Sequence, residues 1–153
     1  MPALVPFALL LVTAATFRSA AAGDEVYQLG PDSERQADVP QGELHEKIFR
    51  SAIFPKTVRR YWVYVPAQYD GNQPAAVMVF QDGHAYIDPA GQFRAPIVMD
   101  NLIHRGEMPV TIGIFIDPGH LTEDVPEKPG WQPAPANRSF EYDTLSDQYA
   151  RMV

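Results

Sequence analysis

Cysteine is absent from the 153 residues of this chain, and its absence excludes three kinds of chemistry. The chain can form no disulfide, hold no zinc ion through cysteine and use no cysteine nucleophile. Basic residues are also few, because 12 Lys and Arg stand against 19 Asp and Glu, which gives a formal net charge of −7. No basic cluster exceeds the pair Arg59-Arg60. We therefore expect no nucleic-acid partner.

The sequence also lacks a motif for a nucleophile and for a helical metal pair. No serine beyond residue 22 stands in a G-x-S-x-G sequence, and none can be combined with a base and an orienting acid. None of the four histidines lies four residues from another, so no metal pair on one helix face is present. His120 stands near Asp117, Glu123 and Asp124, which leaves a metal site there as an alternative. We expect neither a metal nor a cofactor.

The N-terminal 22 residues have the features of an export signal. Residues 3–17 are almost wholly apolar, and Ala20-Ala21-Ala22 follows them. Small residues at this place are what a signal peptidase accepts. The apolar run is too short for a comfortable membrane span. We predict that residues 1–22 are cleaved and that the mature protein, with no membrane span, is secreted or periplasmic. The alternative is a retained anchor or a buried helix.

The next segments divide into a linker and the start of a domain. Residues 23–41 are polar with scattered charges, which is typical of an extended linker that packs loosely. We assign residues 42–153 to the domain. Residues 43–51 form a weak candidate for an edge strand, and residues 58–65 form a stronger one because aromatic and β-branched side chains alternate there. The two strands are close enough in sequence to pair as a hairpin.

The stretch around which the domain is organised covers residues 76–81, where five of six residues are apolar without strict alternation. This pattern predicts a strand buried on both faces, as in a parallel sheet. Pro96 and Gly106 bracket a helix, since proline fits a first helical turn and glycine fits the position after the end. A second apolar strand follows at residues 110–116. This order is a βαβ unit with parallel strands, so the fold class is α/β.

Within that helix, one apolar stripe should cover the sheet. It consists of Val98, Met99, Leu102 and Ile103. In open α/β sheets the chemistry lies in loops beyond the carboxyl ends of the strands. Two segments meet that description: Asp82-Gly83-His84 and the residues that follow Ile116.

The segment after Ile116 differs from the rest of the chain. Residues 117–136 contain five prolines and no periodicity, and a loop of about 20 residues in a compact domain is usually functional or disordered. Thr144-Leu145-Ser146-Asp147 then resembles a capping box with Asp in place of Glu. It predicts a helix that is still running at Val153. We expect a domain truncated after about the fourth strand and the start of the next helix.

Gly83 is a candidate for a catalytic position. A glycine directly after a buried strand lets backbone N–H groups face a ligand. In a serine hydrolase built on such a sheet, one donor of the oxyanion hole comes from the loop after the third strand. Such a donor stabilises the developing negative charge by about 3–4 kcal/mol. On the local sequence alone, an ordinary Asp-Gly turn is favoured over this role, and both interpretations stay open at this level.

Several short motifs occur together in a fixed order. They are Ser51, Arg59 or Arg60, Val63-Tyr64-Val65-Pro66, Tyr69, Val79-Phe80-Gln81-Asp82-Gly83 and Asn137-Arg138-Ser139-Phe140-Glu141-Tyr142. In order and spacing they resemble the esterase family of α/β-hydrolases that includes enterochelin esterases, S-formylglutathione hydrolases (esterase D), feruloyl esterases and mycolyltransferases. The resemblance covers roughly residues 42–153, and it is greatest to secreted enterochelin-esterase-like proteins.

The resemblance implies an α/β-hydrolase fold and cleavage of a carboxylic ester through an acyl-enzyme. It implies that the backbone N–H of His84, beside Gly83, belongs to the oxyanion hole. It also places Asp82, Arg138 and Glu141 at the border of the active site. The nucleophile and the remaining triad residues come later in the family's chains, so we expect the 153 residues alone to be inactive.

The sequence therefore predicts the N-terminal part of a secreted serine esterase that acts on a small-molecule or glycan-linked ester. The alternative is a non-catalytic exported binding domain. In that interpretation the proline-rich loop and the aromatic residues Trp131, Phe140 and Tyr142 hold a glycan or a protein partner.

Overall fold

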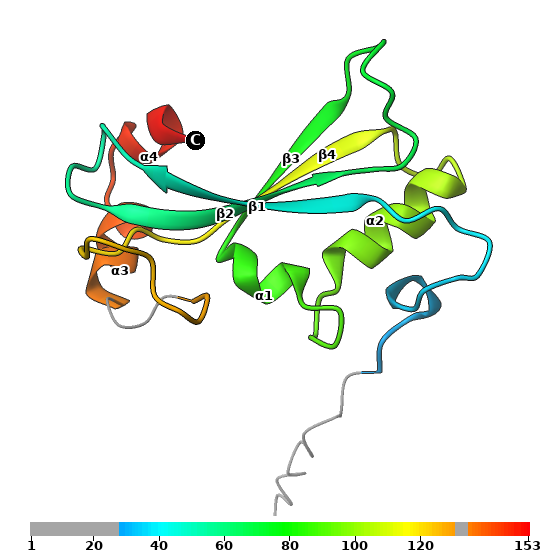
Figure 1. Cartoon of the computed structure of the whole chain (residues 1–153), viewed down its shortest axis with the longest axis horizontal. Coiled ribbons are helices and arrows are strands. Elements are labelled where there is room, and N and C mark those ends of the chain that lie inside the picture. The colour runs from blue at the N-terminus through cyan, green and yellow to red at the C-terminus, as the bar shows by residue number, and fades with distance from the viewer. Residues whose placement is uncertain (1–27, 131–134) are drawn as a thin grey trace, which may run out of the picture.

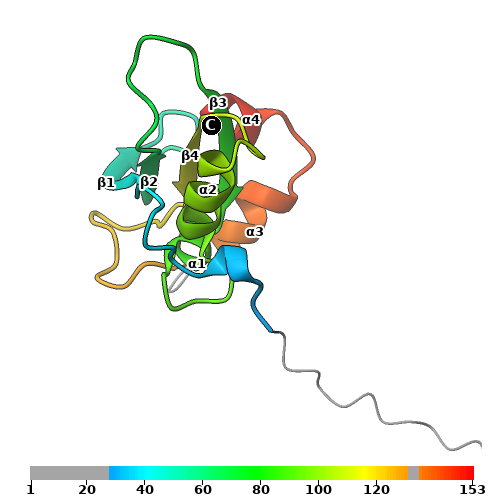
Figure 2. The same ribbon diagram turned by 90° about the vertical axis from the view of Figure 1, so that its right-hand side faces the viewer.

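A computed structural model describes residues 28–130 and 135–153 of the chain. The described residues form a mixed four-stranded sheet in the order β1-β2-β4-β3, and Figure 2 shows the strands following one another in this order from left to right. Two helices, α1 and α2, lie on one side of the sheet (Figure 1). The fold class is thus α/β, as the sequence predicts. Residues 1–22, where we predict the signal, lie outside the described residues.

The first two strands form the predicted hairpin. They are β1 (Glu43–Arg50) and β2 (Val58–Val65), and they pair antiparallel with Glu43 opposite Val65. β2 also pairs antiparallel with β4 (Thr111–Ile116). Successive side chains of a strand point to opposite faces, so Trp62 and Tyr64, which are two positions apart, share one face of β2. Both are buried. β1 is exposed along most of its length, as expected of an edge strand.

The βαβ prediction is confirmed. β3 (Ala76–Gln81) pairs in parallel with β4 along its whole length. The chain between them forms α1 (Gly83–Ile87) and α2 (Ala95–His104). The aromatic ring of Phe80 on β3 stacks on that of Phe115 on β4, with ring centroids 4.6 Å apart.

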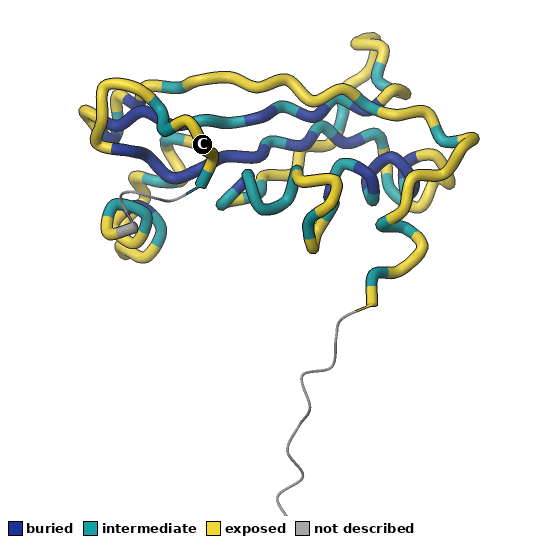
Figure 3. Tube along the Cα trace, turned by 60° about the horizontal axis from the view of Figure 1, so that its bottom comes forward, coloured by how far each residue is buried: buried dark blue, intermediate teal, exposed yellow. Residues whose placement is uncertain are grey.

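The prediction that β3 is buried on both faces is wrong. Val77 is 64% exposed and Val79 is 39% exposed. Among the described residues, β3 pairs only with β4, so it is an edge strand, and α1 and α2 pack on the opposite side of the sheet from these valines. An apolar run indicates a buried strand but not which strand lies at the edge. In Figure 3 the buried residues run along the inner strands and the helix that covers them.

α2 covers the sheet through part of the predicted stripe. Met99 and Ile103 are buried and join Trp62, Tyr64 and Phe115 in the core, whereas Val98 and Leu102 are only half-buried. The helix begins at Ala95 with proline in its first turn. Gly106 has φ +72°, the left-handed conformation that glycine adopts readily after a helix end.

The buried face of α2 is wider than the apolar stripe because the N-terminal segment covers a second side of the helix. That segment contains a short 3₁₀ helix, η1 (Pro31–Ser33). The Asn101 side-chain amide donates to the carbonyl groups of Asp32 and Glu34, at 2.8 and 2.9 Å. Gly42 N–H donates to the Asp100 carboxylate at 2.8 Å. The described part of the segment expected to be a loose linker is therefore fixed to α2 by hydrogen bonds.

Two helices follow the long loop. They are α3 (Pro135–Asp143) and α4 (Gln148–Met152). The sequence does not predict α3, because prolines and glycines dominate the residues before it. The predicted capping box does not cap a helix, since α4 begins after Asp147 with no side-chain capping bond. Residues 117–130 are irregular, as predicted, apart from one β-bridge between Val58 and His120. No helix in the described part of the chain is long and apolar enough to cross a membrane.

Candidate functional site

Charged and polar side chains gather at the carboxyl ends of the parallel strands β3 and β4. Asp82 follows β3 directly, and Asp117 follows β4 directly. Because parallel strands end at the same edge of a sheet, these residues become neighbours, as the rule for α/β proteins leads one to expect. His84 stands in the first turn of α1, between the two carboxylates.

Asp82 holds α3 against this edge. Its backbone is left-handed, with φ 55° and ψ 46°, which a short polar side chain tolerates better than most. The carboxylate receives two hydrogen bonds from the Arg138 guanidinium, one of them 2.8 Å long from Nε. The same guanidinium lies 5.1 Å from the centroid of the Tyr142 ring. The structure thus brings together Asp82 and Arg138, which the sequence placed at the border of the active site.

His84 is bound twice by the buried carboxylate of Asp117. Its backbone N–H donates to Asp117 Oδ1 at 3.0 Å, and its ring Nδ1 lies 2.7 Å from the same oxygen. The other oxygen of Asp117 accepts the N–H of Gly130 at 3.1 Å. The resemblance assigns the backbone N–H of His84 to an oxyanion hole. In this structure that N–H donates to a carboxylate oxygen of the protein itself, Asp117 Oδ1. The hydrogen bond to Asp117 raises the pKa of His84 above 6.5, against the opposing effect of burial.

This hydrogen bond predicts a pH-dependent contribution of His84 to stability. Because the pKa of His84 is higher in the folded than in the unfolded chain, the contribution is present in full below pH 6.5 and is lost as the pH rises through the folded pKa. We expect NMR titration to give a His84 pKa above 6.5 in the native chain and a lower pKa in Asp117→Asn. A His84 pKa unchanged by Asp117→Asn would contradict the assignment.

His120 must be separated from His84 in that experiment. Its pKa is lowered, chiefly by burial, so its contribution to stability has the opposite pH dependence and is lost as the pH falls below 6.5. We therefore compare the free energy of unfolding of the native chain with that of His84→Gln, at pH 5.5 and at pH 8.5. Because His120 is present in both proteins, the difference between them isolates the contribution of His84. The difference between the two proteins should be larger at pH 5.5.

Gly83 is required here by packing. A Cβ at this position would lie 2.4 Å from the carbonyl carbon of Phe115 and 2.6 Å from the backbone nitrogen of Ile116. The start of α1 therefore lies directly on the backbone of β4, and only glycine permits this approach. The close contact fixes the direction of the next N–H group, that of His84.

Glu141 lies inside the protein beneath this edge. Its side chain and that of Arg59 are both fully buried, and they form a two-pronged ion pair of 2.8 and 2.9 Å. Glu141 also accepts the N–H of Gly119 at 3.0 Å. A carboxylate enclosed in this way joins β2, α3 and the loop after β4, and it presents no surface to a substrate.

Asn137 belongs to the same buried network. Its side-chain amide donates to the Gly119 carbonyl and to Glu141 Oε1. Asn137-Arg138-Ser139 matches the sequence signal for N-glycosylation, but the nitrogen that would carry a glycan is the donor of both hydrogen bonds. In the folded chain this nitrogen is thus engaged by the Gly119 carbonyl and the Glu141 carboxylate.

The alternative of a metal site at His120 has no support in the geometry. His120 Nε2 lies 3.0 Å from the carbonyl oxygen of Gly130, and its backbone pairs with Val58. Within residues 28–130 and 135–153, no three His, Asp or Glu side chains come together as metal ligands.

Two residues of the site, Asp117 and Arg59, are noted in the sequence but are not assigned to this site there. Asp117 could have been found because it follows β4 as Asp82 follows β3, at the edge where side chains converge. Arg59 could have been suspected because it and Arg60 are the charged residues of a strand that is otherwise apolar and aromatic, and a buried charge needs a partner. Comparison of the chain with models of known protein families and with characterised proteins gave no match.

Proposed function

We propose that this chain supplies the oxyanion loop of a secreted serine esterase with an α/β-hydrolase fold. The observation that carries the proposal is the place of Asp82-Gly83-His84, which turns from the carboxyl end of β3 into a helix beside the carboxyl end of β4. An α/β-hydrolase takes one oxyanion donor from the loop after its third strand. The mixed sheet, with antiparallel strands beside a parallel pair, is compatible with that fold.

In this proposal the backbone N–H of His84 donates to the negative oxygen of the tetrahedral intermediate. Gly83 brings the loop onto β4, and the pair of Asp82 and Arg138 holds the loop from the other side. Asp117 Oδ1 accepts this N–H at 3.0 Å, so the carboxylate must turn aside when the substrate oxygen takes its place. The donor itself is held in place by the contact of Gly83 with β4, and a donor fixed in advance is what electrostatic stabilisation requires. Displacement of the carboxylate is a cost that substrate binding has to offset.

The proposal also requires catalytic groups that no motif among these 153 residues supplies. The reaction needs a serine that attacks the ester carbonyl, a histidine that removes its proton and an acid that orients the histidine. The substrate is then a small-molecule or glycan-linked carboxylic ester, hydrolysed through an acyl-enzyme without a metal.

The test uses the protein encoded by the whole reading frame that contains this sequence. We expect saturable hydrolysis of an activated acetyl ester and inhibition by a serine-directed phosphonate, whereas the 153-residue chain alone should show neither. His84→Pro removes the N–H and should lower kcat about 10²–10³-fold, the usual cost of one oxyanion donor. His84→Ala keeps the N–H and should change kcat by less than about tenfold. Equal losses in both variants would refute the backbone role.

One observation favours the second candidate, a non-catalytic exported binding domain for a glycan or a protein partner. Phe140 on α3 is 56% exposed, and it borders an apolar hollow. Tyr142, by contrast, is half-buried beside Tyr149. An intact reading frame without a nucleophile motif, together with no ester hydrolysis, would decide for this candidate.

A further inference from the structure

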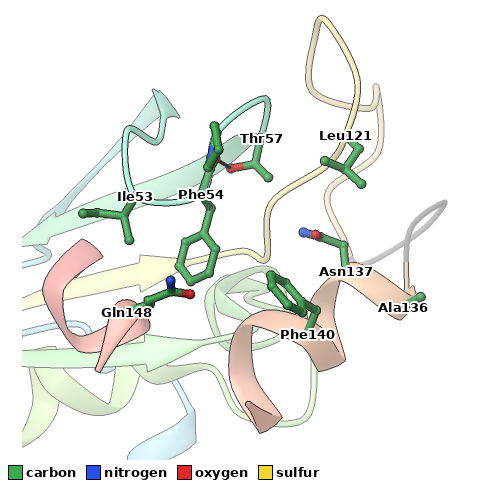
Figure 4. Close-up of a pocket in the computed structure, with 9 residues that line it drawn as sticks. Ile53, Phe54, Thr57, Leu121, Ala136, Asn137, Phe140 and Gln148 are labelled. Carbon is green, nitrogen blue, oxygen red and sulfur yellow. Dashed lines mark hydrogen bonds between the residues drawn. The ribbon is translucent and has the colours of Figure 1, made fainter. Parts of the chain in front are cut away.

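An apolar hollow lies at the same end of the sheet, on the side of α3 that faces the turn between β1 and β2. Its volume is about 550 Å³, which is within the usual range for small-molecule sites. Figure 4 shows the side chains of the turn facing those of α3 across it. The lining residues are Ile53, Phe54, Pro55, Thr57, Leu121, Ala136, Asn137, Phe140 and Gln148.

The wall made by the turn is held in place by its own hydrogen bonds. Ser51 Oγ accepts the N–H groups of Ile53 and Phe54, at 3.1 and 3.0 Å. The Thr57 hydroxyl donates to the Phe54 carbonyl at 2.6 Å. Phe54 is 5% exposed, and its ring packs edge-on against that of Phe140 with centroids 6.3 Å apart. The hollow is therefore preformed.

Two of the three polar side chains of the lining, those of Asn137 and Thr57, make hydrogen bonds inside the protein, and the third is that of Gln148. The Asn137 amide donates to the Gly119 carbonyl and to Glu141 Oε1, and the Thr57 hydroxyl oxygen accepts from Arg59 at 3.0 Å. No described lining residue is charged. The Arg59 guanidinium lies behind the Phe54 ring, 5.9 Å from its centroid, and Glu141 neutralises it. The surface that a ligand meets is thus mainly apolar.

Two large apolar side chains at the rim of the hollow are exposed to solvent, and a bound apolar group would cover them. Phe140 is 56% exposed and Leu121 is 62% exposed. A ring placed against Phe140 and Leu121 would cover apolar surface on both. Aromatic rings also attract one another in edge-to-face and offset arrangements beyond the effect of area alone.

We propose that this hollow is a binding site for an uncharged aromatic group. It is distinct from the cluster of Asp82, His84 and Asp117, and it does not depend on the reaction proposed for that cluster. Charged analogues should bind more weakly because no described lining residue carries an opposite charge, and burying a charge without a counterion is costly.

Indole is the probe for the test, with indole-3-acetate as its charged analogue and the full chain as the receptor. Indole should shift the NMR signals of backbone amides at Phe54, Leu121 and Asn137. Phe140→Asp should weaken indole binding about tenfold or more, since it replaces an aromatic contact by a charge. Leu145→Asp is the matched control because Leu145 is 104% exposed and lies outside the hollow, so indole binding should be unchanged. Indole-3-acetate should bind about tenfold more weakly than indole.

Three results would overturn the proposal. The first is no shift at these amides when indole is raised to its solubility limit. The second is equal indole affinity of native chain and Phe140→Asp. The third is self-association of the native chain that Phe140→Asp abolishes while indole has no effect on it, because the hollow would then be an interface between copies of the chain.

Discussion

Glu141→Gln is expected to lower the free energy of unfolding by about 3–5 kcal/mol, the usual cost of removing one partner of a buried ion pair. The substitution keeps the size of the side chain and removes its charge. Arg59 would then keep a buried positive charge without a counterion, since both side chains are fully enclosed. The new amide group would also point an N–H at neighbours that are themselves donors, among them the N–H of Gly119.

The destabilisation caused by Glu141→Gln should reach the cluster of Asp82, His84 and Asp117 through α3. Glu141 and Arg138 stand on the same helix, and Arg138 binds the Asp82 carboxylate at the end of β3. Weakening the buried anchor of α3 therefore loosens the contact of Arg138 with Asp82. We expect faster hydrogen exchange at the first amides of α1 in Glu141→Gln, because that helix begins at the Asp82 loop.

Urea unfolding of native chain and variant measures the effect. The matched control is Asp124→Asn, which removes the charge of an exposed pair with Arg50 whose side chains are 62% and 93% exposed. The control should leave stability almost unchanged, because exposed pairs contribute little. Arg59→Met combined with Glu141→Leu should recover much of the loss, since no unpaired charge remains. A Glu141→Gln chain as stable as Asp124→Asn would show that the pair contributes nothing measurable.

The sequence predicts the elements of this sheet better than their surroundings. Strand bounds at Val58–Val65 agree because Trp62, Tyr64 and the flanking turn residues set them locally. The exposure of Val77 could not be predicted, because an apolar run has the same appearance in an inner strand and at an edge. α3 was missed because the prolines before it indicate a loop. In the structure this helix is joined to β2 by the ion pair of Glu141 with Arg59, a long-range contact that the local sequence does not reveal.

The site was only partly predictable for the same reason. Asp82, Gly83 and His84 are adjacent in sequence, so their strand-to-turn pattern can be read directly. The partner of Glu141 is 82 positions away, and that of His84 is 33 positions away. Nothing local to Asp117 or Arg59 specifies such partners. The fold brings the ends of β3 and β4 close to the start of β2. A buried carboxylate needs hydrogen-bond donors, so Glu141 pairs with Arg59 and Asp117 pairs with His84 once these segments meet.

Gly83→Val is expected to lower the free energy of unfolding by about 3 kcal/mol, at the upper end of the usual cost of overpacking. A Cβ at this position meets two backbone atoms of β4 at 2.4 and 2.6 Å. These backbone atoms belong to a strand that is paired on both sides, with β2 and with β3, so they cannot move aside as the end of a flexible side chain can. α1 must therefore lift away from β4, and the hydrogen bond from His84 N–H to Asp117 must lengthen with it.

The control for this substitution is Gly30→Val. Gly30 has nothing within 4 Å of an added Cβ, and its φ of −74° with ψ 168° suits any residue. The same side chain is thus introduced without a clash, and the free energy of unfolding should be nearly that of the native chain. Urea unfolding of the three proteins gives the stabilities, and NMR titration of His84 reports the contact with Asp117. In Gly83→Val the pKa of His84 should fall toward 6.5, because the hydrogen bond that raises it is weakened. A Gly83→Val chain as stable as Gly30→Val, with an unchanged His84 pKa, would mean that α1 does not lie on β4 as closely as described and that Gly83 serves only as a turn residue.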